Sequence, residues 1–204
     1  MIKKTLNQNA KYVHELIDII ESDFVFNKEP INRFTKVKID TDNSLKEKNK
    51  QLINLKRRIN SIENCNLKKN SKNLILGEGD INSKIMLIGE APGEIEDSLG
   101  LSFQGEIGSL LNKMLLAINI NRDKVYTTYS VNFRPPSDRK PTSQEIKRYS
   151  IFLKDHISII NPKIVICMGS TAMHAITGLN NKISDERGKW KEIILKNKSL
   201  PLMI

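Results

Sequence analysis

The sequence contains little cysteine and few aromatic residues, and it has no long apolar run. Its two cysteines, Cys65 and Cys167, are too few for a disulfide framework or a cysteine-rich metal site, so we expect a reducing compartment. No apolar stretch reaches the roughly 18 residues of a membrane-spanning helix, and the N-terminus has no signal-peptide core. We therefore expect a cytoplasmic protein without a membrane partner. Aromatics make up only 5% of the chain, so aliphatic side chains must build most of the core.

Positive charge exceeds negative charge, giving a net charge of +10 at pH 7. A nucleic-acid partner is one explanation. The abundance of Lys and Asn also fits the residue usage of an AT-rich coding sequence, so both explanations stay open. Residues 35–73 hold 11 Lys or Arg against 4 Asp or Glu, with weak helical spacing from Leu45 to Ile62. We expect residues 1–73 to form a helical, basic and partly disordered arm, with a short helix at Val13 to Ile20.

Residues 74–204 alternate between apolar strand patterns and amphipathic helix patterns, which is typical of a parallel α/β sheet. Apolar residues from Ile107 to Ile118 recur with helical spacing, and Thr142 with Glu145 forms a capping box that opens a second helix. We expect four strands, at residues 84–89, 125–131, 163–169 and 199–204.

Parallel sheets bind ligands at the carboxyl ends of their strands, and the loop "GEAPGEIED" follows the first strand there. It carries four acidic residues, Glu90, Glu94, Glu96 and Asp97. They are either solvent-facing residues near a helix start or carboxylates that activate water. A metal site is less favoured, because no histidine accompanies them.

Three other side chains fall near the same edge and have two interpretations each. Arg134 and Arg139, in "RPPSDR", belong to an ordinary Pro-stiffened turn or contact the phosphates of a nucleic acid. Phe103 is a core residue or a platform on which a base stacks.

The order and spacing of "GEAPGEIED", "GLSFQGEIG", "RPPSDRKPT", "INPKIVICMGSTA" and "RGKW" resemble the family-four uracil-DNA glycosylases over residues 62–204. The resemblance to this iron–sulfur branch implies a three-layer α/β/α sandwich that flips uracil out of DNA and hydrolyses its N-glycosidic bond in base excision repair. The implied partner is single- or double-stranded DNA, and we expect a monomer.

The resemblance also implies roles for individual residues. Glu90 and Glu96 match catalytic carboxylates. The substrate-binding positions are Ala91, Gly93, Phe103, Tyr129 and Asp138, and the DNA-binding positions are Arg134 and Arg139. Phe103 matches the aromatic residue that stacks on uracil.

The sequence departs from the family at two base-contacting positions. Tyr129 and Asp138 stand where the family has asparagines that contact uracil. A tyrosine cannot present the paired donor and acceptor of an amide, and it would crowd a pyrimidine pocket. An ionised Asp138 would repel the anionic leaving group.

The family also holds a four-iron cluster on four cysteines, and only Cys65 matches one of them. Ile62, Phe133 and Tyr149 occupy the other three positions, so we expect no cluster and no metal. In the family, a strand like "LPLMI" leads into a His-Pro-Ser motif and a final helix. The sequence stops at Ile204, so we expect an incomplete domain with one sheet face partly uncovered.

Three hypotheses follow from these departures. The chain is a working uracil-DNA glycosylase, an impaired or inactive relative that still contacts DNA through residues 35–73, Arg134 and Arg139, or the non-functional remnant of a truncated gene.

Overall fold

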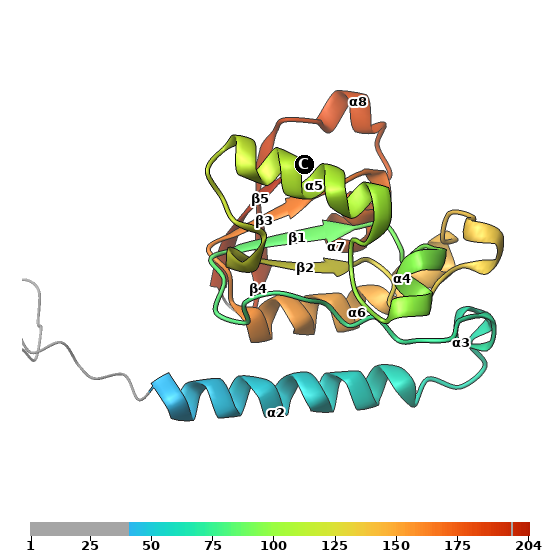
Figure 1. Ribbon diagram of the computed structural model, residues 1–204. Coiled ribbons are helices and arrows are strands. Elements are labelled where there is room, and N and C mark those ends of the chain that lie inside the picture. The colour runs from blue at the N-terminus through green and yellow to red at the C-terminus, as the bar shows by residue number, and fades with distance from the viewer. Residues whose placement is uncertain (1–40, 197) are drawn as a thin grey trace, which may run out of the picture. The chain divides into compact units, whose positions relative to one another are not determined.

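The computed structural model describes residues 41–196 and 198–204, and it contains one mixed sheet between helical layers (Figure 1). The α/β sandwich expected from the sequence is confirmed, but the sheet has five strands instead of four. Their order is β2-β1-β3-β5-β4. The helix predicted at Val13 to Ile20 lies outside the described residues.

Four of the five strands run parallel, and each corresponds to a strand predicted from the sequence. β4 is antiparallel to β5 and forms one edge of the sheet. The strands are β1 (Ile85–Gly89), β2 (Val125–Tyr129), β3 (Ile164–Cys167), β4 (Trp190–Leu195) and β5 (Lys198–Met203).

The sequence pattern missed β4 because this strand has only one fully buried side chain, Ile193. Trp190 and Ile194 are exposed beside charged residues, so the strand shows no continuous apolar run. Its place depends on the pairing with β5, in which Trp190 lies opposite Met203 and Leu195 opposite Lys198. Pairing of this kind is set by the hairpin and not by local apolar content.

The helices lie between and around these strands (Figure 1). The α-helices are α2 (Thr41–Asn60), α3 (Asn66–Asn70), α4 (Glu94–Leu99), α5 (Gly105–Ala117), α6 (Ser143–Ile160), α7 (Ser170–Thr177) and α8 (Ile183–Glu186), and the short 3-10 helices are η1 (Arg122–Lys124) and η2 (Pro136–Asp138). None of the helices between residues 41 and 204 combines the length and the apolar character that a membrane crossing requires.

α6 and α7 cover one face of the sheet. The predicted capping box is present, since the Glu145 N–H donates to Thr142 Oγ1 and the Thr142 N–H donates to the Glu145 carboxylate. The apolar face of α6 is buried together with side chains of β1, β3 and β5. The buried residues of that face are Ile146, Tyr149, Leu153, Ile157 and Ile160, as the spacing predicted.

α2 packs against α6 and is not a free arm. Leu52, Leu55 and Ile59 are buried at this contact. The Lys48 ammonium donates hydrogen bonds to the carbonyl oxygens of Ile81 and Ile160. These bonds fasten α2 to the segment before β1 and to the end of α6. α2 therefore belongs to the same compact unit as the sheet.

α5 covers the other face and buries only a narrow stripe. Gly108, Leu111 and Leu115 are its buried residues. Gly108 approaches the chain so closely that a Cβ there would lie 1.8 Å from the Phe103 carbonyl oxygen. The predicted helix is present, and its apolar residues from Ile107 to Ile118 divide into a buried stripe and an exposed one.

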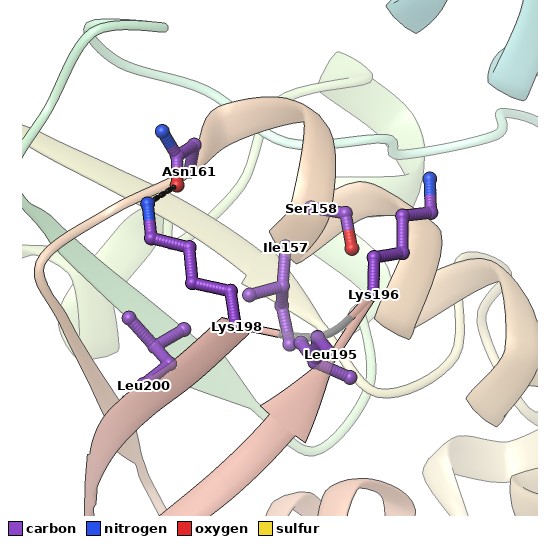
Figure 2. Close-up of a pocket in the computed structure, with 7 residues that line it drawn as sticks. All are labelled: Ile157, Ser158, Asn161, Leu195, Lys196, Lys198 and Leu200. Atoms are coloured by element: carbon purple, nitrogen blue, oxygen red, sulfur yellow. Dashed lines mark hydrogen bonds between the residues drawn. The ribbon is translucent and has the colours of Figure 1, made fainter. Parts of the chain in front are cut away.

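A small pocket lies at the amino-terminal end of β5, between the end of α6 and the β4–β5 hairpin (Figure 2). Ile157, Leu195 and Leu200 form its apolar wall. The Lys198 ammonium donates a hydrogen bond of 2.5 Å to Asn161 Oδ1 beside it. This contact anchors the hairpin to α6 at the edge opposite to the one predicted for ligands.

A histidine lies on the buried face of α6. His156 is fully enclosed, and its Nε2 lies 2.9 Å from the Tyr126 hydroxyl. Burial lowers the pKa of His156 to about 3. The imidazole is therefore neutral in the folded protein at every pH near neutrality.

We predict that the protein becomes less stable as pH decreases below about 6.5, because His156 stays neutral in the folded chain. The unfolded chain binds a proton near pH 6.5 while the folded chain resists it until about pH 3, so the stabilising contribution is complete above about 6.5 and is lost as pH falls. The free energy of unfolding should drop by roughly 1.4 kcal/mol per pH unit from pH 6.5 to 5. Urea unfolding at several pH values measures this slope. The His156→Gln variant should lack it, and an equal slope in that variant contradicts the assignment.

Candidate active site

A groove lies at the carboxyl ends of the parallel strands, where the loops after β1, β2 and β3 meet. The acidic loop, the first turn of α5, the end of β2 and the Pro-Pro loop line it. The sequence predicted that these loops would share one edge. The groove contains every predicted site residue except Arg134: Glu90, Ala91, Gly93, Glu96, Phe103, Tyr129, Asp138 and Arg139.

Glu96 is buried and holds two loops together. Its Oε2 accepts a hydrogen bond from the Gly93 N–H and its Oε1 accepts one from the Gln104 N–H, both at 3.0 Å. A side-chain oxygen at a helix start can accept from backbone N–H groups that have no acceptor within the helix. Both oxygens are thus engaged by the backbone, and this arrangement gives Glu96 a positioning role in the groove.

Asp97, the neighbouring residue, points away from the groove and fastens residues 71–73 to α4. Its carboxylate accepts hydrogen bonds from the Ser71 hydroxyl and from the backbone N–H groups of Lys72 and Asn73. Burial alone would raise the pKa of Asp97, but these hydrogen bonds outweigh burial and leave the pKa below its usual value. Its function is structural.

Glu90 is the acidic side chain that best combines access to the groove with an oriented carboxylate. It follows β1 directly and is half-buried. The Thr171 hydroxyl, from the first turn of α7, donates a hydrogen bond of 2.8 Å to Glu90 Oε2. This contact orients the carboxylate, and Glu90 lines the groove, where a carboxylate can polarise water.

Phe103 and Tyr129 stack on each other in the middle of the groove. Their ring centroids are 4.8 Å apart and the ring planes differ by 20°. The Phe103 N–H also donates a hydrogen bond of 2.8 Å to the Tyr129 hydroxyl. Phe103, for which the sequence predicted stacking on a base, is only 9% exposed and carries the Tyr129 ring on its face.

The stack depends on a close approach at Gly89. A Cβ at this position would lie 2.7 Å from the Phe103 ring and 3.0 Å from the Tyr129 ring, so only glycine fits there. Burial raises the pKa of Tyr129, so its phenol is neutral. The hydroxyl is therefore a hydrogen-bonding group at the bottom of the groove and not an anion.

Arg134 and Asp138 form a two-pronged ion pair within the Pro-Pro loop. The Nε and Nη2 atoms of Arg134 each lie 2.7 Å from an oxygen of Asp138, and Nη2 also lies 3.4 Å from Glu94. The hydrogen bond from Arg134 lowers the pKa of Asp138 below its usual value. Asp138 is thus an anion whose charge is balanced inside the loop.

Arg139 is held in a similar way. Its guanidinium nitrogens lie 2.9 and 2.8 Å from the two carboxylate oxygens of Glu145, the capping residue of α6. This contact lowers the pKa of Glu145 to about 2. A phosphate contact by either arginine would have to share or replace these internal partners.

Comparison with known proteins identifies the family. Residues 76–203 match the family model described as the uracil DNA glycosylase superfamily. The chain belongs to the uracil DNA glycosylase superfamily. It is 37% identical to the type-4 uracil-DNA glycosylase of Thermotoga maritima over 64% of this chain and 69% of that one. The corresponding protein of Archaeoglobus fulgidus is 35% identical over 70% of this chain and 73% of its own length. A DNA polymerase of Bacillus phage SP01 is 31% identical over 57% of this chain but only 13% of the polymerase.

The resemblance to the iron–sulfur branch of this superfamily implies cluster cysteines at positions 62, 65, 133 and 149. These four positions do lie together, in one packed group. Cys65 Sγ is 3.2 Å from the Tyr149 hydroxyl, and the Phe133 and Tyr149 rings meet edge to face at 6.4 Å. Ile62 packs against the same group.

These residues do not fit a four-iron cluster. Such a cluster takes four protein ligands, usually thiolates, and this group offers one thiol. Burial raises the pKa of Tyr149, which disfavours the phenolate that could ligate iron. Within residues 41–196 and 198–204, no three His, Cys, Asp or Glu side chains gather closely enough to hold a metal ion.

The sequence did not point to two residues that position the acidic loop. Thr171 orients Glu90, and Ser71 anchors the acidic loop through Asp97. Both partners are more than 20 residues from the carboxylates they contact. No local pattern distinguishes such serines and threonines from those on the surface, so only the folded chain reveals them.

We predict that Glu96→Gln destabilises the protein. In the variant, the amide NH₂ would face one of the two backbone N–H groups that now donate to Glu96. That backbone N–H group would lose its acceptor, and a buried N–H without an acceptor costs about 1–3 kcal/mol. Urea unfolding measures the loss. Glu94→Gln is the matched control, because Glu94 is exposed on the same helical turn and should change stability by less than about 0.5 kcal/mol. Equal effects of the two substitutions would contradict the role given to Glu96.

Proposed function

We propose that this chain is an impaired uracil-DNA glycosylase, a DNA-contacting relative that removes uracil slowly or not at all. The single observation that carries the proposal is the Tyr129 ring stacked on Phe103 at 4.8 Å. The names of the relatives support the activity class. Base excision repair in the cytoplasm is the setting that the sequence predicts.

The glycosylase reaction makes defined demands on the groove. The flipped uracil must first enter a pocket. A water oxygen then bonds to the sugar C1′ and gives up a proton, while the C1′–N1 bond breaks and uracil leaves with the bonding electron pair. The uracil anion finally takes up a proton, so the products are neutral uracil and a sugar that carries a hydroxyl at C1′. Positive charge grows on the sugar and negative charge on the base. In this proposal Glu90 orients the water and stabilises the sugar, and the hydrogen bond from Thr171 to its carboxylate supports that role.

The closed stack opposes the first of these steps. A base that stacks on Phe103 needs the ring face that Tyr129 covers, and the Tyr129 hydroxyl is fastened by the Phe103 N–H. A second weakness concerns the leaving group. Asp138 stands where the resemblance expects an amide donor, and its carboxylate accepts from Arg134 instead of donating to a base. A missing donor of this kind commonly costs about 10²–10³ in rate.

We predict that Tyr129→Asn uncovers the ring of Phe103 and raises the glycosylase activity. A single-turnover assay with excess protein and a uracil-containing single-stranded oligonucleotide should show few alkali-labile breaks for the unmodified chain. Tyr129→Asn removes the ring and supplies an amide, so breaks should form at least about tenfold faster. Tyr129→Phe, which keeps the ring, is the matched control and should show no gain. Rapid cleavage by the unmodified chain that Tyr129→Asn leaves unchanged or lowers would overturn the proposal.

Two further substitutions, each added to the Tyr129→Asn variant, test the roles of the Glu90 and Glu96 carboxylates. Glu90→Gln should abolish the restored cleavage if Glu90 acts on water or the sugar. Glu96→Gln should lower cleavage together with stability, as expected of a positioning residue. Loss of cleavage with full stability in Glu96→Gln would instead return the catalytic role to Glu96, as the sequence predicted.

A second function, binding of DNA without cleavage, is favoured by a basic stripe on α2. Lys46, Lys50 and Arg57 are exposed and recur at intervals of four and seven residues, on the side of α2 away from the buried Leu55. No ion pair to an acidic residue occurs at these three side chains within residues 41–204. Cations at this spacing suit the phosphates of a duplex.

We predict that binding to a uracil-free duplex weakens steeply with salt and depends on this stripe. Each phosphate contact should add about −0.9 to the slope of log affinity against log salt. Lys50→Glu combined with Arg57→Glu should weaken binding at least about tenfold. Lys163→Glu combined with Lys182→Glu makes the same charge change elsewhere and should have a smaller effect. Salt-independent binding, or equal losses in both pairs, would contradict the role of α2. Fluorescence anisotropy measures both quantities.

A further inference from the structure

Three segments that are distant in the sequence meet at the start of the Pro-Pro loop. They are the turn between α2 and α3, the chain that follows β2, and α6. The first contributes Ile62 and Cys65, the second Phe133 and the third Tyr149. We call these four residues the junction group. Cys65, Phe133 and Tyr149 are 5%, 3% and 0% exposed, so the junction belongs to the core.

The contacts within the junction group are those of a packed core. The rings of Phe133 and Tyr149 meet edge to face at an interplanar angle of 72°. This geometry is favourable for aromatic pairs beyond the area that they bury. The Tyr149 hydroxyl lies 3.2 Å from Cys65 Sγ, so its buried polar atom has a hydrogen-bond partner. The group is therefore held together by ring packing and by one hydrogen bond.

The resemblance implies that these four positions hold the cysteines of an iron–sulfur cluster. A cluster there would cross-link the three segments through bonds between iron and thiolate sulfur. The whole chain has two cysteines, and the second, Cys167, ends β3 in a different core group. Four thiolates therefore cannot gather at this junction. Apolar or aromatic side chains occupy the other three positions and pack against each other.

We propose that the junction group replaces the iron–sulfur cluster as the connection between these segments. Packing of the two rings takes over what metal–thiolate bonds would supply, and the folded chain needs no iron. An oxidant or a chelator that destroys a cluster should then leave this protein intact. The proposal concerns how the domain is held together, so it does not depend on whether the chain cleaves uracil.

Two arginines strengthen the same connections from the surface. Arg148, on α6, donates a hydrogen bond of 3.2 Å to the carbonyl oxygen of Asn64 in the turn between α2 and α3. Arg58, near the end of α2, pairs with Asp155 of α6 at 2.8 Å, and its guanidinium lies 5.4 Å from the centroid of the Phe152 ring. These contacts join the α2 side of the junction to α6 without a metal ion.

The junction group also reaches the candidate active site. Phe133 directly precedes Arg134, and the loop that follows lines the groove with Pro135, Asp138 and Arg139. The buried ring of Phe133 fixes the start of this loop. The junction group therefore determines where one wall of the groove begins.

Iron content tests whether the chain folds without a cluster. The full chain, produced in cells supplied with iron and purified without oxygen, should contain fewer than about 0.5 iron atoms, against about four for an occupied site. Treatment with an iron chelator should change its melting temperature by less than about 1 °C. Iron and acid-labile sulfide at about four atoms per chain would overturn the proposal, as would a melting temperature that the chelator lowers by more than this.

Substitution of Phe133 tests whether packing makes the connection. Phe133→Ala should lower the melting temperature by at least about 6 °C, because it leaves a cavity where a buried ring packed. Ile151→Ala is the control on α6, since Ile151 is 62% exposed, and should lower it by less than about 2 °C. Phe133→Leu should give an intermediate shift, which preserves the comparison if Phe133→Ala does not fold. Equal shifts for substitutions at the two positions would contradict the proposal.

Hydrogen exchange shows which segments the junction group connects. In Phe133→Leu, backbone amides should exchange faster both in the turn between α2 and α3 and in the Pro-Pro loop, while those of β3 keep their protection. A general loss of stability would instead speed exchange in β3 as well, and that result would contradict a local connection. Faster exchange confined to the Pro-Pro loop would overturn the claim that the group joins this loop to the other segments.

Discussion

The stack of Phe103 on Tyr129 is the contact on which the candidate site depends. It joins the end of β2 to the turn before α5, and it holds Phe103 at a positive φ of 52°, where non-glycine residues are uncommon. Glu96 secures the same turn by accepting from the Gln104 N–H. Gly89 makes room for both rings. The groove is therefore organised around its own aromatic side chain, in the place where the resemblance puts a base.

The acidic loop of this basic protein is explained by partners inside the fold. Glu90 is held by Thr171, Glu94 lies near Arg134, and the carboxylates of Glu96 and Asp97 accept from backbone amides. Three of these contacts join α4 or β1 to loops that are distant in the sequence. The loop thus gathers acids because carboxylates satisfy buried N–H and O–H donors at a crowded strand edge. Of these four residues, Glu90, Glu94 and Glu96 line the groove, and Asp97 does not.

The two faces of the sheet are covered unequally. α6 and α7 cover one face, with α2 packed outside α6. On the other face, α5 is the one helix of the described residues that joins the core group, through Leu111 and Leu115. Several large apolar side chains of α5 therefore stay exposed.

The sequence by itself determined the local elements and the family. Apolar periodicity marked α6 and the four parallel strands, the Thr142–Glu145 box marked a helix start, and the ordered motifs identified the superfamily. Tertiary structure alone decided which side chains are partners: that Tyr129 covers Phe103, that Arg134 closes on Asp138, and that β4 joins the edge of the sheet. Periodicity also could not separate the buried from the exposed side of α5. The reason is physical, because periodicity reports how one segment divides apolar from polar residues. Burial and pairing depend instead on what distant segments bring into contact.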